Sequence, residues 1–327
     1  MPIRNDQLFL QWRRFSFELP CSIVTARGAL NKRYGYLIRL ENHKGQIGWG
    51  EVVSTEETSL ENKSIAIALE KLSRLINSKY LFSILKIVPP VLRFGIGSAL
   101  GELEGRVIKL SEGSIYALPS AYLLPAGSSA PKILAQLLSE THRERALTIK
   151  WKVGVLNDIS ERHILEELLN ILPDSTCIRL DANGGWDRVT ASAWADRLIN
   201  DPRLQWFEQP LNSNDQLGLD NLARHVPVAL DESLFVYPNL RSTWNGWQVR
   251  RPALEGDPRC LLAALETTPR LMISTCLETG IGRRWINHLA ACQMQGPTPV
   301  VPGLAPSWCP EGNLFSFDPQ KVWEAAK

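Results

Sequence analysis

Short apolar runs that each end in a charged residue recur between Thr148 and Arg251. The runs are TIKWK, CIRLD, LQWFE, PVALD and WQVRR, and their ends lie 20 to 29 residues apart. An interval of this size holds one strand, one helix and two short loops, so the pattern predicts successive β/α units. A charge at the end of an apolar strand costs free energy unless the strand delivers it to a polar site. We therefore expect these strand ends to converge on one functional rim.

Eight strands that alternate with helices are predicted along the second part of the chain. The strands are expected at Ala117–Leu124, Leu147–Val153, Thr176–Asp181, Leu204–Glu208, Val226–Asp231, Gly246–Arg251, Leu271–Ser274 and Thr298–Val301. The clearest helical patterns cover Ile159–Leu172, Arg188–Ile199 and Arg283–Met294. This alternation predicts an α/β fold, a closed TIM-type (β/α)7β barrel, whose active site lies at the carboxyl ends of its strands.

The first part of the chain has a period-two pattern instead. RYGYLIRLE alternates apolar residues, NHKG supplies a turn, and QIGWGEVV continues as a partner strand. Residues 12–53 therefore predict an antiparallel meander, with an earlier strand near Phe15–Leu19 and a polar loop at Pro20–Asn31.

Helical spacing follows at residues 60–110. An apolar stripe runs from Ile65 to Leu75, and the Pro89-Pro90 pair can open a second helix. A sheet followed by helices indicates an N-terminal α+β domain that is separate from the barrel. We expect this domain at residues 1–110, the barrel at residues 111–304, and a tail at about 305–327 that packs back on the first domain.

Charge and composition narrow the class of partner. Lys plus Arg (36) nearly balance Asp plus Glu (34), which argues against a nucleic acid and favours a small-molecule ligand. The six cysteines form no C-x-x-C pair, which argues against a zinc ribbon or a redox motif. We interpret them as small core residues of a protein in a reducing compartment. The polar start MPIRNDQ and the lack of any run of about 18 apolar residues predict a cytoplasmic protein without a membrane segment.

Three acids end consecutive predicted strands: Asp181, Glu208 and Asp231. Carboxylates packed together repel and raise one another's pKa, and a divalent cation removes that repulsion. An oxygen-only ligand set of this kind suits Mg²⁺. Taken singly, Asp181 and Asp231 also suit the capping of a following helix, but their recurrence at three successive strands favours a shared metal.

Lys150 and Lys152 are two residues apart and therefore point to the same side of a strand. If they point inward, the two ammonium groups lower each other's pKa, and a nearby metal cation lowers it further. A lysine pKa lowered from about 10.4 to about 7 or 8 would let one of the two act as a base. The alternative is that both side chains extend outward into solvent at an edge.

These motifs together resemble those of the enolase superfamily, in the branch that includes muconate lactonizing enzymes, dipeptide epimerases and o-succinylbenzoate synthases. The resemblance rests on Lys150-x-Lys152, Asp181 in DANGGW, Glu208 in FEQP and Asp231 in LDES. GWGEVV and RFGIGSALGELEG resemble the N-terminal capping domain of that superfamily. Residues Met272 to Ala291, followed by GLAPSW, are most similar to the o-succinylbenzoate synthases.

The resemblance implies a magnesium-dependent carbon–oxygen lyase, with Mn²⁺ able to replace Mg²⁺. The reaction would be syn elimination of water from 2-succinyl-6-hydroxy-2,4-cyclohexadiene-1-carboxylate, giving o-succinylbenzoate on the route to menaquinone or phylloquinone. By analogy Lys152 removes the α-proton and returns it to the departing hydroxide, while Lys150 supports the enolate carboxylate. The partner is then a small carboxylate, without nucleic acid or membrane partners, and the chain is expected to be a monomer or a weak homo-oligomer.

The chain departs from the superfamily pattern at Arg251-Pro252, where the sixth strand usually ends in Lys-Pro. A guanidinium has a pKa above about 12 and cannot act as a base near neutrality. Racemases and epimerases of this branch need a base on each face, whereas a one-base elimination needs only a cation opposite the lysine. An N-acylamino acid racemase or dipeptide epimerase, and a carboxylate-binding barrel with weak or lost catalysis, stay open as alternatives.

Four further polar residues are candidates for the same rim. Asn183 and Gln209 follow two of the acids and either support the metal or serve the adjacent loops and helix caps. Ser274 and Thr275 end the seventh strand and could bind the succinyl carboxylate.

Overall fold

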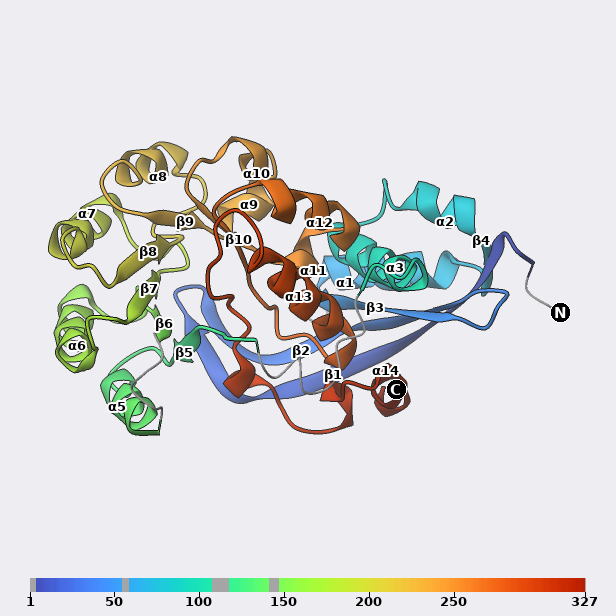
Figure 1. Cartoon of the computed structure of the whole chain (residues 1–327), viewed down its shortest axis with the longest axis horizontal. Helices are drawn as coiled ribbons and strands as arrows, with labels where there is room; N and C mark the ends of the chain where they lie inside the picture. The colour runs from blue at the N-terminus through green and yellow to red at the C-terminus, as the bar shows by residue number, and fades with distance from the viewer. Residues whose placement is uncertain (1–3, 55–58, 108–117, 141–146, 327) are drawn as a thin grey trace.

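The computed structural model describes residues 4–54, 59–107, 118–140 and 147–326 and contains two β-sheets. The first is antiparallel in the order β3-β2-β1-β4, and the second is parallel in the order β11-β10-β9-β8-β7-β6-β5. Figure 1 shows the long β1–β2 hairpin running beneath the molecule until its tip lies beside the strands β5 and β6. The antiparallel sheet therefore reaches the barrel rather than ending short of it.

The antiparallel sheet is formed by β1 (Gln7–Thr25), β2 (Gly28–Glu41), β3 (Ile47–Ser54) and β4 (Leu75–Asn77). The predicted meander is confirmed, but the loop expected at Pro20–Asn31 is wrong. β1 continues past a register shift after Glu18, and Ile23 pairs with Leu30 across a two-residue turn at Ala26-Arg27. Gly28, with φ +118°, allows that turn. The exposed face of this hairpin is mostly polar, so its sequence lacks the clear run of apolar residues that indicates a strand.

Helices α1 (Leu60–Lys71), α2 (Ser78–Ile84) and α3 (Pro90–Leu103) accompany this sheet. Pro90 opens α3 as predicted, but α1 ends at Lys71, and Leu75 belongs to β4. α3 lies directly on β3, since a Cβ on Gly50 would stand 1.8 Å from the carbonyl oxygen of Gly95. Glycine at both positions lets the helix approach the strand this closely.

Seven of the eight predicted barrel strands are present within a few residues of their expected bounds. They are β5 (Tyr122–Leu124), β6 (Thr148–Lys152), β7 (Cys177–Asp181), β8 (Leu204–Glu208), β9 (Val228–Leu230), β10 (Trp247–Arg250) and β11 (Leu271–Ile273). The expected start of the first, at Ala117, lies outside the described residues. The helices on this part of the chain are α5 (Ala130–Glu140), α6 (Asp158–Ile171), α7 (Arg188–Leu198), α8 (Gln216–Leu222), α9 (Ser233–Val236), α10 (Leu240–Thr243), α11 (Pro252–Glu255), α12 (Pro258–Thr267) and α13 (Gly280–Gln293).

The eighth strand expected at Thr298–Val301 is wrong. The barrel is closed instead by a short extended segment around Gly303, whose amide donates to Ile273 (2.8 Å) and whose carbonyl accepts from Thr275 (3.0 Å). On the other side, the amide of Ala121 donates to the carbonyl of Pro302 (2.9 Å). Prolines lack the N–H that a strand ladder needs, and three of them in residues 297–302 reduce this strand to a bridge.

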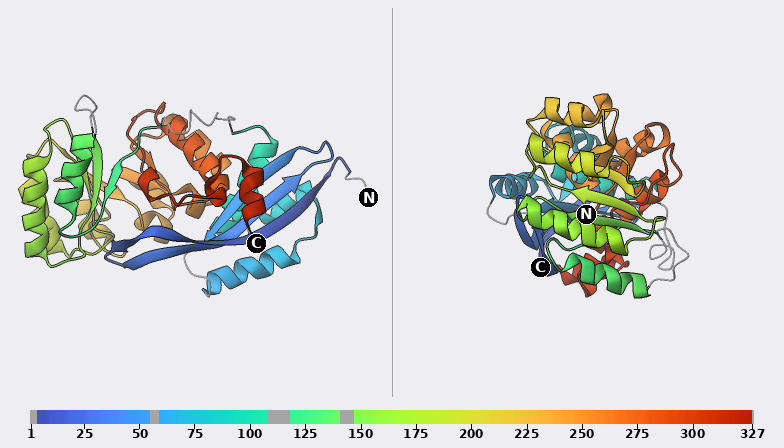
Figure 2. Two further views of the ribbon diagram at one scale, coloured as in Figure 1. Left: turned by 90° about the horizontal axis from the view of Figure 1, so that it is seen from below. Right: turned by 90° about the vertical axis from the view of Figure 1, so that its left-hand side faces the viewer.

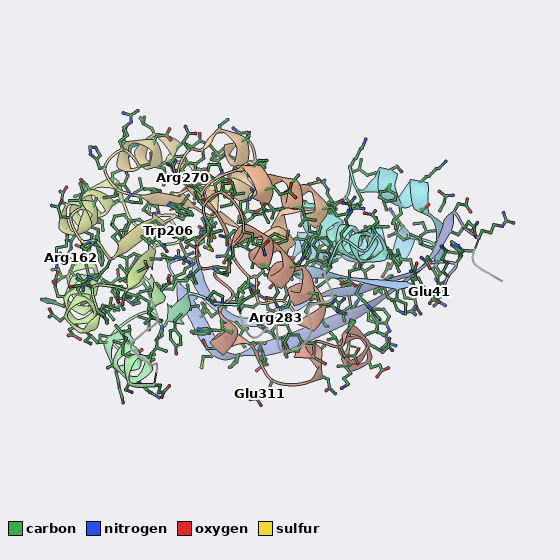
Figure 3. The ribbon with its side chains drawn as sticks, in the orientation of Figure 1. Glu41, Arg162, Trp206, Arg270, Arg283 and Glu311 are labelled. Atoms are coloured by element: carbon green, nitrogen blue, oxygen red, sulfur yellow. The ribbon has the colours of Figure 1, made fainter. Side chains whose placement is uncertain are left out.

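The barrel interior is packed by aromatic and aliphatic side chains. Trp206 is fully buried there, with its ring centroid 4.9 Å from that of Trp247 (Figure 3). The guanidinium of Arg179 lies 4.1 Å from the centre of the Trp206 ring and donates to Gln205 and to the carbonyl of Val301. The lower barrel is thus a filled core, so any ligand must bind at the rim.

The C-terminal segment comprises the short 3-10 helices η1 (Pro306–Trp308) and η2 (Asn313–Phe315) and the helix α14 (Pro319–Ala325). α14 lies against the antiparallel sheet (Figure 2), where Trp323 packs on Trp49 at 5.6 Å and on Arg13. The domain boundary expected at 110/111 falls outside the described residues, and we propose the two-domain division on the basis of the two separate sheets. Within the part of the chain that is described, no helix combines the length and apolar composition needed to cross a membrane.

A buried glutamate joins the antiparallel sheet to the barrel. Glu51 of β3 accepts hydrogen bonds from the Thr279 amide (3.1 Å), the Thr279 hydroxyl (2.5 Å) and the Gly282 amide (2.9 Å) at the start of α13. Burial raises the pKa of Glu51 to about 7, and the hydrogen bonds from Thr279 and Gly282 only partly oppose this. The folded chain therefore holds this proton more tightly than the unfolded chain does.

We predict that the stability supplied by protonated Glu51 is present below pH 4.5 and is lost as the pH rises through 7. Relative to a Glu51→Gln variant, the free energy of unfolding should fall by about 3 kcal/mol between roughly pH 5 and 8. Urea unfolding at several pH values measures this difference, with Glu18→Gln on an exposed part of β1 as control. Parallel profiles for the wild type and Glu51→Gln would contradict the prediction.

Candidate active site

Three acids lie together at the carboxyl ends of β7, β8 and β9. Asp181 is the last residue of β7, Glu208 is the last of β8, and Asp231 directly follows β9. The parallel register sets Lys152 opposite Asp181, and Asp181 opposite Glu208. All three acids are buried, so the strands deliver their charges into the molecule rather than to bulk solvent.

Lys150 and Lys152 both point toward these acids. The Nζ of Lys150 lies 2.5 Å from Glu208 Oε1 and 2.7 Å from Asp181 Oδ2. The Nζ of Lys152 lies 2.6 Å from the same Asp181 oxygen and 2.8 Å from Asn183 Oδ1. One ammonium thus touches both Asp181 and Glu208. The alternative in which these lysines extend into solvent is wrong, because both side chains are buried.

Arg251 approaches the same cluster from the end of β10. Its guanidinium forms an ion pair with Asp231, with Nη2 2.6 Å from Oδ2 and Nε 2.9 Å from Oδ1. The same Nη2 lies 4.0 Å from Glu208 Oε1. Nη1 donates to the carbonyl of Thr275 (2.7 Å). Burial would lower the pKa of Arg251, but Asp231 outweighs burial and raises it, so the guanidinium is a permanent cation. The preceding Arg250 pairs with Glu255 instead.

The acids dominate the electrostatics of the cluster. Burial would lower the pKa of Lys150, but the adjacent Asp181 and Glu208 outweigh burial and raise it, and the lowering expected for one lysine beside a metal cation stays a prediction. The pKa of Asp181 is held low, because Lys150 and Lys152 outweigh the effect of burial. Burial, and then the charge of Asp181, raise the pKa of Glu208 to about 7.

The donor set fits a hard divalent cation. Glu208 Oε2 is buried and has no hydrogen-bond partner among the described residues. Burial and then the charge of Asp181 raise the pKa of Glu208, and a divalent cation would remove that repulsion. Within the described ranges, no three His, Cys, Asp or Glu side chains are grouped at metal-ligand spacing, and the strand-end carboxylates bond lysine and arginine. The roles of Asp181, Glu208 and Asp231 as ligands therefore stay a prediction that rests on their convergence and oxygen chemistry.

A cavity of about 310 Å³ opens above the cluster. Its barrel wall carries Lys150, Lys152, Asn183 and Arg251, and its opposite wall comes from the β1–β2 hairpin. The lining is otherwise largely apolar, with Ile23, Leu30, Leu123, Leu277 and Ala305. A charged floor beneath apolar walls suits a small ring or chain that carries a carboxylate.

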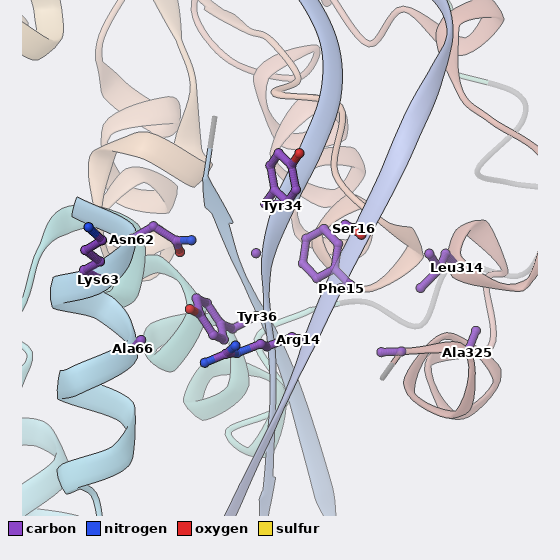
Figure 4. A pocket seen from close by; sticks show the side chains of 12 residues that line it. Arg14, Phe15, Ser16, Tyr34, Tyr36, Asn62, Lys63, Ala66, Leu314 and Ala325 are labelled. Atoms are coloured by element: carbon purple, nitrogen blue, oxygen red, sulfur yellow. The ribbon is translucent and has the colours of Figure 1, made fainter. Parts of the chain in front are cut away.

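A hollow of about 420 Å³ lies elsewhere, between the antiparallel sheet, α1 and the C-terminal segment. Figure 4 shows Arg14, Tyr34 and Tyr36 on the strands facing Asn62 and Lys63 of α1. It includes none of the strand-end acids. We therefore place the chemistry in the smaller cavity, where the titratable groups converge.

The four additional candidates have different surroundings. Asn183 lines the cavity and joins Lys152 to Glu232, to which its Nδ2 donates at 3.1 Å. Gln209 is buried outside the cavity, where it accepts from the amides of Asp231 (3.1 Å) and Ser233 (3.0 Å) and donates to the carbonyl of Leu211. Ser274 and Thr275 line the cavity, but the Thr275 hydroxyl donates to Glu278.

Sequence reasoning missed three charged residues that line this cavity: Arg27, Arg33 and Glu232. Glu232 directly follows Asp231, and its position after a strand-end acid was the available signal. Arg27 lies at the hairpin tip, with its Nε 3.2 Å from the carbonyl oxygen of Asn183 and 3.6 Å from Glu232. No periodicity in the sequence indicates that this hairpin reaches the barrel.

Comparisons with known proteins agree with this geometry. The family model described as "Enolase C-terminal domain-like" matches residues 133–243. The chain is 35% identical to an o-succinylbenzoate synthase from Thermosynechococcus vestitus, with 85% of this chain and 87% of that protein covered. It is 28% identical to an o-succinylbenzoate synthase from Pectobacterium atrosepticum, covering 89% of this chain and 88% of the other.

Solved structures show the same relationship. The crystal structure of an o-succinylbenzoate synthase from Thermosynechococcus elongatus, complexed with Mg in the active site, has a TM-score of 0.78 and 31% identity, covering 96% of this chain and 99% of the other. The L-Ala-D/L-Glu epimerase from Bacillus subtilis has a TM-score of 0.70 at 19% identity, covering 95% and 92% of the two chains. The second likeness shows a shared fold alone.

We predict that Gln209→Leu lowers the free energy of unfolding by about 2 to 4 kcal/mol, because the amides of Asp231 and Ser233 lose their buried acceptor. Denaturant unfolding measures the change. Gln216→Leu, at an exposed position of α8, is the matched control and should stay within about 0.5 kcal/mol of the wild type. Equal stability of the two variants would show that Gln209 does not hold this loop.

Proposed function

Because the chain belongs to the o-succinylbenzoate synthase family of the enolase superfamily, we propose that its buried lysine and acid cluster carries out the dehydration that defines that family. The enzyme is a lyase. Its substrate, 2-succinyl-6-hydroxy-2,4-cyclohexadiene-1-carboxylate, loses a proton and a hydroxide and becomes aromatic. The single observation that supports this assignment best is the pair of buried lysines beside three acids at the floor of a cavity with a largely apolar lining.

Lys152 is the proposed base. It lines the cavity, and its neutral amine would take the proton from the ring carbon that bears the carboxylate. The resulting ammonium then returns that proton to the departing hydroxide, so that water leaves and the lysine is neutral again. Asn183 holds the Lys152 side chain in position by accepting from its Nζ at 2.8 Å.

Lys150 and Arg251 supply fixed positive charge. Neither is suited to act as the base, since the pKa of each is raised by neighbouring carboxylates. Lys150 would stabilise the negative charge that develops on the substrate carboxylate when the α-proton leaves. Arg251, anchored on Asp231, would face the ring from the β10 side of the cavity.

Asp181, Glu208 and Asp231 are the proposed ligands of Mg²⁺, in agreement with the magnesium complex of the relative from Thermosynechococcus elongatus. When bound, the ion supplies positive charge next to the substrate carboxylate. Asp181 also lies against both lysines, with its Oδ2 2.7 Å from the Nζ of Lys150 and 2.6 Å from that of Lys152. Mn²⁺, which accepts the same oxygen ligands, is proposed as a substitute.

Arg251 favours dehydration over the racemase and epimerase alternatives. A two-base reaction needs a group on the second face that can give up its proton, and a guanidinium bonded to Asp231 cannot. The likeness to dipeptide epimerases therefore extends to the fold but not to this residue. A monomer or weak homo-oligomer remains our expectation for the assembly.

We predict that Lys152→Ala reduces kcat of the Mg²⁺-supplied enzyme by about a thousandfold or more, because among the described residues that line the cavity only Lys150 carries another amine, and that amine bonds Glu208 and Asp181. Absorbance at the wavelength of the aromatic product measures turnover, and circular dichroism confirms the fold. Lys132→Ala, at an exposed position of α5, should retain full activity. Substantial turnover by a folded Lys152→Ala variant would remove the proposed base.

We also predict that Mg²⁺ raises the Tm of the chain in a saturable way, because it binds the folded acids and not the unfolded chain. Glu208→Gln should weaken the apparent Mg²⁺ affinity by about tenfold or more, and Mn²⁺ should give the same pattern. Glu166→Gln, on the exposed face of α6, serves as the control. An unchanged Mg²⁺ response in Glu208→Gln would exclude Glu208 as a ligand.

A further inference from the structure

Arg33 is a buried cation that the chemistry proposed so far does not use. It lies on β2, paired in register with Phe17 of β1, and only 9% of its surface is exposed. Its side chain lines the same cavity as Lys150, Lys152 and Arg251. The antiparallel sheet, rather than the barrel, therefore contributes a guanidinium to the binding site.

The Nε of this guanidinium is buried and has no hydrogen-bond partner. Within the described residues, no ion pair joins Arg33 to an acid. The buried Arg250 differs because it pairs with Glu255, and the fully buried Arg179 donates to Gln205 and to the carbonyl of Val301. Burial also lowers the pKa of Arg33 below its ordinary value. The charge of Arg33 is thus desolvated without an ion pair, and Glu278 and Glu51 only partly oppose the effect of burial.

The two acids that attract the charge of Arg33 most strongly, Glu278 and Glu51, already accept hydrogen bonds from other groups. Glu278 accepts from the Thr275 hydroxyl and from the Cys276 amide (2.8 Å). Glu51 accepts from Thr279 and Gly282 at the start of α13. A buried cation without an ion pair is costly, and the cost falls when an anion binds against it. The free face of Arg33 therefore suits an anionic group of a ligand in the cavity.

We propose that Arg33 binds the second carboxylate of the substrate, at the end of its succinyl chain. This inference rests on the proposed function, which assigns the ring carboxylate to the cluster formed by Lys150, Lys152 and the strand-end acids. Arg33 lines the cavity from the β1–β2 hairpin, which also contributes the apolar Ile23 and Leu30 to the lining. A ligand with two carboxylates joined by an apolar body matches this distribution of charge.

Arg33 is a better candidate for this contact than the two hydroxyls that end β11. The Thr275 hydroxyl already donates to Glu278 and accepts from the Leu277 amide (2.7 Å). The Ser274 hydroxyl is 3.4 Å from the Gly303 carbonyl and carries no charge. A guanidinium binds a carboxylate through two parallel hydrogen bonds, which a single hydroxyl cannot supply. Arg33 is therefore the residue that determines specificity for the dicarboxylate.

Titration calorimetry on the Mg²⁺-loaded enzyme tests this role with two ligands. One is the product o-succinylbenzoate, and the other is 2-butanoylbenzoate, in which a methyl group replaces the succinyl carboxylate. Wild-type enzyme should bind the first about 10- to 100-fold more tightly, as expected for a charged hydrogen-bonded pair. Arg33→Met should bring this ratio close to one, with KM for the substrate raised far more than kcat is lowered.

Three further measurements separate binding from a structural role. Lys32→Met removes a neighbouring cation whose side chain is 41% exposed, and it should keep the wild-type ratio. Ligand-free Arg33→Met should unfold at the same Tm as the wild type or a higher one, because it loses a buried charge that has no ion pair. Arg33→Lys, which keeps the charge without the bidentate geometry, should retain an intermediate ratio.

An unchanged ligand ratio in Arg33→Met would overturn the proposal, and so would an equal loss of affinity for both ligands. Failure of the proposed function has a different signature. In that case the wild-type enzyme would not dehydrate the substrate with Mg²⁺ present. A ratio that still collapses in Arg33→Met would then support Arg33 as a carboxylate site of a different activity.

Discussion

The sharing of Asp181 between two lysines is the interaction on which the site depends. A single oxygen, Oδ2, lies 2.7 Å from Lys150 and 2.6 Å from Lys152, and both ammonium groups are buried. Buried charges of one sign are unstable unless opposite charges are held against them. Asp181, Glu208 and Asp231 face Lys150, Lys152 and Arg251, so the formal charges balance. Any ligand or ion that binds one of these six charged groups changes the proton affinity of the others.

The second requirement is a roof over this cluster, and the β1–β2 hairpin provides it by lining the cavity above the lysines. The sheet is held to the barrel at two separate places. Glu51 bonds the start of α13, and Arg27 reaches the carbonyl of Asn183 beside the acids. Glycines allow the close approach, since a Cβ on Gly185 would stand 2.6 Å from Ala26. Charged pairs beneath such a roof interact more strongly than they would in water.

The sequence was most informative where a charge ends an apolar run. Asp181, Glu208, Lys150 and Lys152 were placed correctly because the strand period decides which side chains share a face and which end is the rim. Arg33 was not found, because it faces a cavity rather than a neighbouring acid, and no spacing rule describes a buried cation without an ion pair. The eighth strand was misplaced because β-branched Val300 and Val301 are typical of strands, whereas the flanking prolines lack the N–H groups that strand pairing needs. The contact between the hairpin tip and Asn183 joins residues far apart in the chain, so no local sequence pattern indicates it.

Arg251 connects the fold to the choice of reaction. Proteins that share this architecture at low identity include epimerases, so the barrel and its roof do not by themselves select dehydration. Selection depends on which rim groups can exchange a proton. The guanidinium of Arg251 is bonded to Asp231 through both Nε and Nη2 and cannot give up a proton. With Lys152 as the proposed base, one face of the cavity moves a proton and the other only holds charge. An elimination in which one lysine both takes the proton and returns it to the leaving hydroxide needs no more than this.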